Sequence, residues 1–219
     1  MISSIRLKKI VKKYTPEGFT LCINNLELSN NHIHVVAGSN GSGKSTLLRV
    51  ISLLDSPDKG RIMFDNECVS PEQNGQKRLR KKIGFVMQNP YLFNMNVFEN
   101  VAIGLKIRKY KRAETVSRVK KILVDFKIDH LSNQNAHKLS SGEVQKVAIA
   151  QILVWEPKVI LLDEPTANID AQSTLSIEKI IKQIHKTLDS LIIITTHSLD
   201  QAYRISSNTI SLREGKVFN

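Results

Sequence analysis

The sequence has few of the features on which secreted and membrane-spanning proteins depend. Only two cysteines, Cys22 and Cys68, occur among 219 residues, which is too few for a disulfide framework. No uninterrupted apolar run approaches the roughly 18 residues of a membrane-spanning helix, and the first residues lack the apolar core of a secretory signal. Internal repeats and low-complexity segments are missing as well. We therefore expect a soluble, cytoplasmic chain of one domain or two small ones, long enough to fold without disulfides.

Aromatic residues make up only 5% of the chain, whereas basic residues are in excess. Lysine and arginine number 32 against 20 aspartates and glutamates, which gives a formal net charge of +12. Such an excess suits nucleic acid, anionic lipid or an acidic partner. However, Tyr110 is the only aromatic in the basic runs Lys77–Lys82 and Lys106–Arg112, so the stacking platform of a single-strand binder is missing. A solvated basic face is the simpler interpretation, and nucleic acid is not an expected partner.

Residues 37–46 match the pattern G-x-x-x-x-G-K-[ST], with Lys44 and Ser45 as its last two positions. The short β-branched run at 33–36 precedes the pattern and indicates a buried strand. The apolar residues of 46–54 follow it with the spacing of a helix. The pattern therefore stands between a strand and a helix, which is the context that a phosphate-binding loop requires.

The chemistry of this loop follows from its residue types. Glycines let the backbone bend around a phosphate without a Cβ in the way, and the loop N–H groups with the first helical turn then face the anion. Lys44 can reach the terminal phosphates of a nucleoside triphosphate, and Ser45 can supply a hydroxyl to Mg²⁺. The alternative is a glycine-rich turn that binds nothing, which the flanking elements disfavour. The expected phosphate-binding residues are Gly38, Ser39, Asn40, Gly41, Ser42, Gly43, Lys44, Ser45 and Thr46.

Alternating apolar and polar residues predict two antiparallel strands over residues 3–11 and 19–28. The sequence Thr-Pro-Glu-Gly at residues 15–18 predicts the turn between them. A further strand is expected over 61–64, followed by a polar loop over 66–76. These strands indicate an antiparallel sheet beside the nucleotide-binding core.

The remainder of the chain combines helical spacing with short apolar strands. The strands are expected over residues 83–87, 159–163 and 191–195, and such fully apolar runs are typical of a parallel sheet covered on both faces. Between the first two, the pattern from residue 89 to about 153 is helical and indicates a helical subdomain inserted into an α/β core. Asp170 is expected to cap the next helix.

A second group of chemical side chains follows two of these strands. Asp163 and Glu164 end the strand over 159–163, where open α/β sheets place their ligands. Asp163 fits a ligand of Mg²⁺, and Glu164 fits the group that orients or deprotonates an attacking water. His197 ends the next strand, after Thr195 and Thr196, where it can contact a γ-phosphate. The alternatives are solvent-facing carboxylates and a structural histidine.

In their order along the chain, these motifs resemble the nucleotide-binding subunit of ATP-binding cassette (ABC) transporters over nearly the whole length. The matching segments are Lys44 and Ser45 (Walker A), Gln88 in Val-Met-Gln-Asn-Pro (Q-loop), Leu139–Glu143 (signature), Asp163–Thr166 (Walker B with the catalytic glutamate), Ala167–Asp170 (D-loop), His197 (switch histidine) and Tyr14 (the aromatic that stacks on adenine).

The resemblance implies an α/β P-loop NTPase (RecA-like) core with an antiparallel β subdomain and an inserted α-helical subdomain. We expect residues 1–88 and 154–219 to form the nucleotide-binding core with its β subdomain, and residues 89–153 the helical subdomain with the signature motif. The Q-loop residue Gln88 then lies at their junction, where it can report the state of the nucleotide to a membrane partner.

The resemblance also implies an ATPase that uses ATP and Mg²⁺. Two copies are expected to form a head-to-tail dimer around two ATPs. Lys44 of one copy then binds the γ-phosphate together with Ser140 and Gly142 of the other, which lie at a helix N-terminus. Ser140 and Glu143 also have the spacing of a capping box at this helix N-terminus. The implied catalytic residues are Glu164, His197, Gln88 and Lys44, the metal ligands are Ser45, Gln88 and Asp163, and Tyr14 and Asp170 complete the nucleotide site.

Two positions of the signature differ from the family pattern Leu-Ser-Gly-Gly-Gln. Ser141 replaces a glycine, and Glu143 replaces the glutamine. The hydroxymethyl group at position 141 adds bulk beside the phosphate, which puts the tightness of the contact with the second copy in question. Neither change removes a catalytic group.

The family resemblance places the chain on the inner face of the cell membrane, bound to a transmembrane permease and served by a solute-binding protein. Residues 89–105 resemble importer subunits, loosely those for tungstate or related oxyanions, and for a chain of this length we expect no C-terminal regulatory domain. The alternatives are an exporter subunit, an ABC-type ATPase acting on nucleic acid, and a small-molecule kinase. No sustained heptad array supports the nucleic-acid ATPase, and the signature and Asp-Glu-Pro-Thr segments argue against the kinase.

Overall fold

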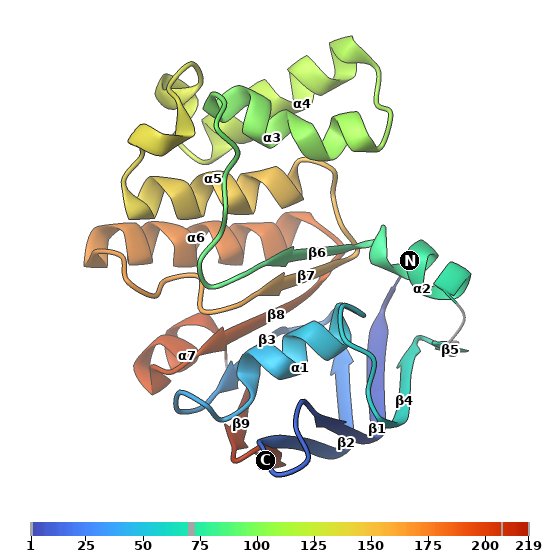
Figure 1. Cartoon of the computed structure of the whole chain (residues 1–219). Coiled ribbons are helices and arrows are strands. Elements are labelled where there is room, and N and C mark those ends of the chain that lie inside the picture. The colour runs from blue at the N-terminus through green and yellow to red at the C-terminus, as the bar shows by residue number, and fades with distance from the viewer. Residues whose placement is uncertain (1, 70–72, 207, 219) are drawn as a thin grey trace. The chain divides into compact units, whose positions relative to one another are not determined.

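The computed structural model describes residues 2–69, 73–206 and 208–218 (Figure 1). The chain forms two compact units. The first comprises Met1–Phe85, Lys158–Glu164 and His185–Asn219, and the second comprises Val86–Pro157 and Pro165–Ile184. Within the described part of the chain, no helix is both long and apolar enough to cross a membrane.

The first unit is built on one sheet, which has ten strands among the described residues in the order β5-β4-β1-β2-β10-β9-β3-β8-β7-β6. The strands are β1 (Ser4–Lys13), β2 (Thr20–Ser29), β3 (Ile33–Ala37), β4 (Lys59–Phe64), β5 (Glu67–Cys68), β6 (Ile83–Val86), β7 (Val159–Leu162), β8 (Leu191–Thr196), β9 (Thr209–Arg213) and β10 (Lys216–Phe218).

One part of this sheet is antiparallel, as the alternating sequence pattern predicted. Strand β1 pairs antiparallel with β2 and with β4, and Leu7 faces Leu26 on β2 and Ile62 on β4. These apolar side chains are buried, because residues of period two share one face of a sheet. The predicted turn is also confirmed, since the Gly18 N–H donates to the Thr15 carbonyl over 3.2 Å.

The other part is parallel and carries the ends of the predicted catalytic strands. Strand β8 lies between β3 and β7 and pairs in parallel with both, and β9 pairs in parallel with β3 on its other side. Every residue of β3, β7 and β8 is buried, as the continuous apolar runs predicted. Since the strands are parallel and adjacent, their carboxyl ends meet at one edge.

Helix α1 (Lys44–Ile51) follows the glycine loop and lies in the core of the first unit. Its apolar side chains Leu47, Leu48, Val50 and Ile51 are all 0% exposed, and they pack with residues of both parts of the sheet. The phosphate-binding loop is therefore fixed at its helical end by the core itself.

The prediction that this helix continues to Leu54 is wrong. The helix ends at Ile51, because the Leu53 N–H bonds to the Val50 carbonyl and the Leu54 N–H to the Arg49 carbonyl. This is the hydrogen-bond pattern of a Schellman motif, in which Leu53 takes the left-handed conformation at φ 62°. Leu53 stays buried, whereas Leu54 is 51% exposed.

Two further helices of the first unit lie where the sequence predicted none. Helix α2 (Gln73–Arg80) and strand β5 occupy part of the predicted polar loop, residues 66–76, of which residues 70–72 lie outside the described part. Helix α7 (Leu199–Ile205) follows β8 and is capped by Ser198, whose hydroxyl accepts the Gln201 N–H. Both helices are too short for their apolar spacing to stand out.

The second unit is helical. It contains α3 (Val97–Ile107), α4 (Arg112–Asp125), the 3₁₀ turns η1 (Asp129–Leu131) and η2 (Ala136–Lys138), α5 (Ser141–Leu153), and α6 (Ala171–Thr187) as far as Ile184. Asn100 is fully buried and fixes the segment before α3, since its side chain accepts the Phe93 N–H and donates to the carbonyls of Phe93, Met95 and Asn96. The predicted helical subdomain, residues 89–153, lies wholly within this unit, and most of α6 belongs to it as well.

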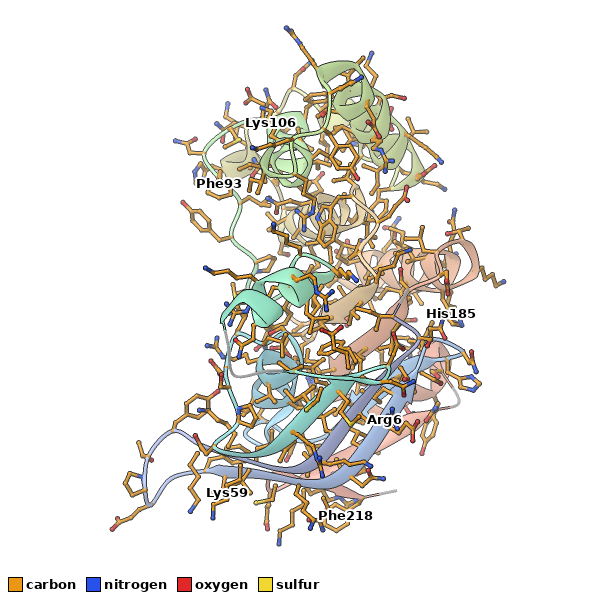
Figure 2. All side chains as sticks on the ribbon, turned by 90° about the vertical axis from the view of Figure 1, so that its right-hand side faces the viewer. Arg6, Lys59, Phe93, Lys106, His185 and Phe218 are labelled. Atoms are coloured by element: carbon orange, nitrogen blue, oxygen red, sulfur yellow. The ribbon has the colours of Figure 1, made fainter. Side chains whose placement is uncertain are left out.

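The outward face of the antiparallel strands carries much of the positive charge. Lys8 lies directly opposite Arg61, and Arg213 directly opposite Lys216, with all four residues exposed. Like charges that face each other across strands destabilise a sheet slightly. Figure 2 shows this side, with Arg6 on β1 and Lys59 on β4.

Candidate active site

The loop between β3 and α1 holds the Lys44 ammonium at the centre of the site. Its Nζ donates to the carbonyls of Gly38 and Ser39 over 2.8 and 3.0 Å, and it lies 3.0 Å from a carboxylate oxygen of Glu164. The start of the loop is tied to β8, because the Gly38 N–H donates to the Thr196 carbonyl. Lys44 is 4% exposed, so its charge is compensated inside the protein.

Two glycines of the loop are required by its geometry. A Cβ at Gly38 would lie 2.2 Å from the Leu212 carbonyl oxygen, and one at Gly43, where φ is 104°, would lie 2.5 Å from the Phe19 ring. The Ser42 hydroxyl is buried inside the loop and has no hydrogen-bond partner in the described part of the chain. A loop that excludes side chains and keeps a spare buried donor fits a phosphate group.

The carboxyl ends of β7 and β8 bring three polar groups together. The Thr195 hydroxyl donates to Asp163 Oδ1 over 2.6 Å and accepts the Glu164 N–H over 2.9 Å. Asp163 and Glu164 are 4% and 8% exposed. Glu164 has a positive φ of 44°, a backbone conformation that costs energy for a residue with a side chain.

The Glu164 carboxylate lies between two possible cations. Lys44 is 3.0 Å from one oxygen, and the exposed His197 ring places Nδ1 3.1 Å from the other. Burial by itself raises the pKa of the Glu164 carboxyl, but the hydrogen bonds and charges of Lys44 and His197 outweigh it, so its pKa lies below the ordinary value. Glu164 is therefore ionised at neutral pH.

The donor set fits Mg²⁺, which prefers oxygen ligands. Ser45 is exposed in the first turn of α1, and the Asp163 carboxylate is oriented by Thr195. Gln88, the third predicted ligand, is exposed in the bend after β6 and belongs to the second unit.

Tyr14, the predicted adenine-stacking residue, is fixed by its hydroxyl. The hydroxyl donates to Asp55 over 2.5 Å, and Arg49 of α1 binds the same carboxylate through two nitrogens. Burial, followed by the Asp55 contact, raises the pKa of the Tyr14 phenol, while Thr46 and Arg49 act in the opposite sense. The ring is 54% exposed and therefore open to a stacking partner.

The signature residues lie at the N-terminus of α5 in the second unit. Ser140 and Glu143 form the predicted capping box. A Cβ at Gly142 would lie 2.4 Å from the Ser173 hydroxyl of α6, so only glycine fits there, whereas the exposed Ser141 meets no such limit. Asp170 caps α6, as predicted, by accepting the Ser173 N–H over 2.8 Å.

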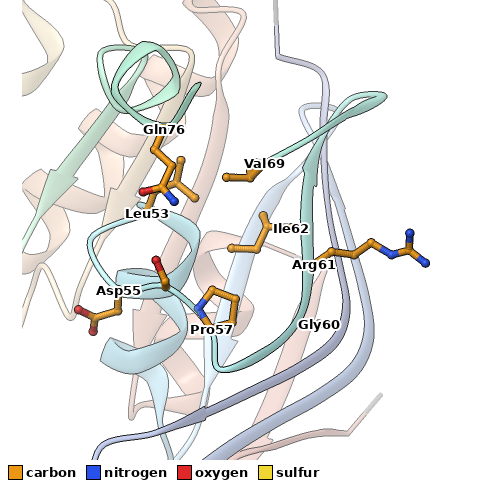
Figure 3. Close-up of a pocket in the computed structure, with 9 residues that line it drawn as sticks. Leu53, Asp55, Pro57, Gly60, Arg61, Ile62, Val69 and Gln76 are labelled. Carbon is orange, nitrogen blue, oxygen red and sulfur yellow. The ribbon is translucent and has the colours of Figure 1, made fainter. Parts of the chain in front are cut away.

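A separate cavity of about 170 Å³ lies between α2, β4 and the segment after α1 (Figure 3). Its lining includes Leu53, Pro57, Ile62 and Gln76, and Arg61 points away from it. The cavity contains none of the predicted site residues and is smaller than the roughly 300–1,000 Å³ of typical ligand pockets.

The structure thus gathers Lys44, Asp163, Glu164 and His197 in the first unit, and Ser140, Gly142 and Asp170 in the second. Sequence reasoning assigned no role to Thr195, Asp55 or Ser173. For Thr195 a signal was present, because two hydroxyl residues end an otherwise apolar strand. The contact of Asp55 with Tyr14 and the approach of Ser173 to Gly142 join residues distant in sequence, so no local pattern indicates them.

Comparison with known proteins gives a consistent result. A family model described as "ABC transporter" matches residues 23–167. The chain is 37% identical over 195 residues to the energy-coupling factor transporter ATP-binding protein EcfA2 of Clostridium perfringens, covering 88% of this chain and 68% of the relative. It is 36% identical over 207 residues to the tungstate uptake system ATP-binding protein TupC of Peptoclostridium acidaminophilum, covering 94% of each.

Among solved structures, the chain is similar to the ATP-binding cassette MJ0796, determined as a dimer in a post-hydrolysis state bound to ADP and Pi. The TM-score is 0.87 at 29% identity, and the match covers 98% of this chain and 97% of that one.

Glu164 should make the unfolding free energy of the chain depend on pH in the acid range. Its pKa is lower in the folded chain than the ordinary 4.5, so the ionised carboxylate contributes stability that is complete above that pH and is lost as the pH falls through the folded-state pKa. The variant E164Q lacks this contribution. We expect urea titrations at about pH 7 and about pH 4 to show a smaller loss of unfolding free energy for E164Q than for the unmodified chain.

The matched control is E114Q, which removes an exposed carboxylate of α4 that pairs with Arg118. It should keep the acid dependence of the unmodified chain. If the unmodified chain and E164Q lost the same unfolding free energy between the two pH values, the assigned environment of Glu164 would be wrong.

Proposed function

The chain belongs to the ABC transporter family, and from this premise we propose that it is the ATPase subunit that powers import of a small solute. ABC cassettes bind and hydrolyse ATP, and this chain is an ATPase of that kind. The observation that carries the proposal is the cluster of Lys44, Glu164 and His197 at the ends of adjacent parallel strands.

In the proposed reaction, Lys44 binds the β- and γ-phosphates of ATP, Glu164 accepts a proton from the attacking water, and His197 holds the γ-phosphate. Glu164 has the ionisation state that a base needs, because Lys44 and His197 keep its pKa low. When the Lys44 charge is neutralised by the phosphates, this depression weakens and the carboxylate becomes a stronger base. Nucleotide binding and activation of the base are thereby linked through one ion pair.

Ser45, Asp163 and Gln88 are the residues proposed to hold Mg²⁺, which supplies neutralisation of phosphate charge when bound. The Thr195 hydroxyl keeps Asp163 in one orientation for this role. Tyr14 is proposed to stack on adenine, and the Asp55 contact fixes its ring for stacking.

We propose that two copies enclose two ATPs head to tail. Each ATP is bound by Lys44 of one copy and by Ser140 and Gly142 at the N-terminus of α5 of the other, where the positive end of the helix dipole favours an anion. Asp170 lies beside this helix end, since Ser173 contacts both Asp170 and Gly142. The dimeric state of the MJ0796 cassette supports this arrangement.

The proposed partners are a transmembrane permease and a solute-binding protein, with the ATPase on the cytoplasmic face of the membrane. We favour tungstate or a related oxyanion as the solute, because TupC matches over 94% of both chains. The comparable identity to EcfA2 extends over only 68% of that relative.

The first prediction from the proposed function concerns turnover. E164Q should bind ATP with unchanged affinity and lose hydrolysis by a factor of about 10²–10³ or more, because it removes the group that positions and deprotonates water. Phosphate release and binding of a fluorescent ATP analogue measure the two quantities. E114Q should retain full turnover, since exposed ion pairs contribute little, and near-normal hydrolysis by E164Q would refute the role of Glu164.

The second prediction tests the head-to-tail arrangement by mixing two inactive variants. K44M loses the lysine, and S140D keeps a good helix cap while it places a negative charge at the phosphate contact. Each should be inactive alone, but their mixed dimer contains one intact site, formed by Lys44 of S140D and Ser140 of K44M. We expect ATP hydrolysis to reappear on mixing, and a mixture as inactive as its components would argue against sites shared between copies.

The third prediction concerns the solute. Cells in which this chain is deleted should lose tungstate accumulation, measured as cellular tungsten, and expression of the unmodified chain should restore it. Expression of E164Q should fail to restore it, because import requires hydrolysis. Normal tungstate accumulation in the deleted cells would reject the oxyanion assignment and leave the ATPase assignment intact.

A further inference from the structure

The carboxylate of Glu143 occupies the hydrogen-bond donors of Ser140. One oxygen, Oε2, accepts both the Ser140 N–H and the Ser140 hydroxyl, each over 2.8 Å. The reciprocal bond, from the Glu143 N–H to the Ser140 hydroxyl, is longer at 3.4 Å. The shorter contacts are therefore the two hydrogen bonds that Glu143 Oε2, an oxygen of a negatively charged group, accepts from Ser140.

This carboxylate lies at the end of α5 that is proposed to bind the phosphate of the second copy. Ser140 and Ser141 are exposed there, Glu143 is half-buried, and Gly142 is packed against Ser173. An acid in the first helical turn neutralises part of the positive potential of the helix N-terminus. Two like charges that are brought together at an interface repel each other and disfavour association unless something separates them.

We propose that Glu143 is a built-in competitor of the ATP held by the partner copy and that it sets the ATP concentration at which two copies associate. To bind Ser140, the phosphate has to replace Glu143 as the acceptor of the hydroxyl hydrogen bond, and it has to approach a negative charge. The closed dimer therefore forms less readily than it would with a neutral residue at position 143. Glu143 is thus a positioning residue that acts through Ser140. This inference rests on the proposed head-to-tail dimer.

Replacing Glu143 with glutamine tests the charge of the side chain separately from its shape. E143Q keeps an oxygen that can accept one bond from Ser140, and it keeps the length of the side chain, so the cap survives in part. It removes the negative charge completely. A purely structural role predicts that E143Q weakens association because the cap is poorer, whereas competition with phosphate predicts that it strengthens association.

The experiment measures ATP-dependent self-association by sedimentation velocity in the hydrolysis-deficient E164Q background. We expect the double variant E164Q/E143Q to dimerise at an ATP concentration lower by about tenfold or more than E164Q alone. The ATP affinity of the monomer, measured at dilute protein, should be the same for both. The gain should shrink as salt is added, because it is electrostatic.

Glu99 provides a matched control within the same unit. It is also the third residue of a capped helix, since the Asn96 side chain accepts the Glu99 N–H at the start of α3. E99Q therefore makes the same charge change in the same helical position, away from Ser140. The double variant E164Q/E99Q should dimerise like E164Q, and thermal unfolding should show all three variants folded.

Each outcome bears on the inference. If E164Q dimerises with ATP and E143Q gives no gain over E99Q, or a loss, the competition is refuted while the head-to-tail dimer stands. If E143Q and E99Q give equal gains, the effect is one of net charge and the specific role of Glu143 is refuted. If E164Q itself stays monomeric at saturating Mg-ATP, the proposed dimer fails, and the inference fails with it.

Discussion

The contact between the Lys44 ammonium and the Glu164 carboxylate is the central interaction of the first unit. It joins the loop after β3 to the end of β7, and both groups are nearly buried. A buried charge needs compensation inside the protein, and Lys44 finds it in the Glu164 carboxylate and the carbonyls of Gly38 and Ser39. The backbone around the pair is also tightly specified, with Gly38 against the Leu212 carbonyl and Glu164 at a positive φ.

The apolar core supplies the rigidity that such a contact needs. Helix α1 is short, but its apolar side chains are completely enclosed by both parts of the sheet. Burial of a leucine or isoleucine side chain is worth roughly 1.5–3 kcal/mol, so the helix cannot shift without exposing several such residues. Strained residues such as Glu164 persist only where their surroundings fix them this firmly. The position of Lys44 thus follows from hydrophobic packing one and two turns further along α1.

The sequence predicted the parts of this arrangement that depend on local pattern. The glycine loop, the fully apolar strands and the capping residues Asp170 and Ser140 each have a recognisable local signal, and the structure contains all of them. Strand order has no such signal. That β10 joins the antiparallel strands to the parallel ones, through Lys216 opposite Cys22, depends on contacts across almost the whole chain. The two hydroxyl residues at the end of β8 are a visible signal, but the partner of Thr195 is not, because its bond to Asp163 exists only when β7 and β8 are neighbours. The end of α1 was missed because a leucine, not a glycine, takes the left-handed position.

The packing of Gly142 against Ser173 has a mechanical consequence for the second unit. The backbone of α5 at Gly142 approaches the Ser173 side chain of α6 so closely that a Cβ would overlap it, and Ser173 is bonded through its N–H to Asp170. A side chain introduced at position 142 would therefore have to displace Ser173, the residue that anchors the cap of α6 at Asp170.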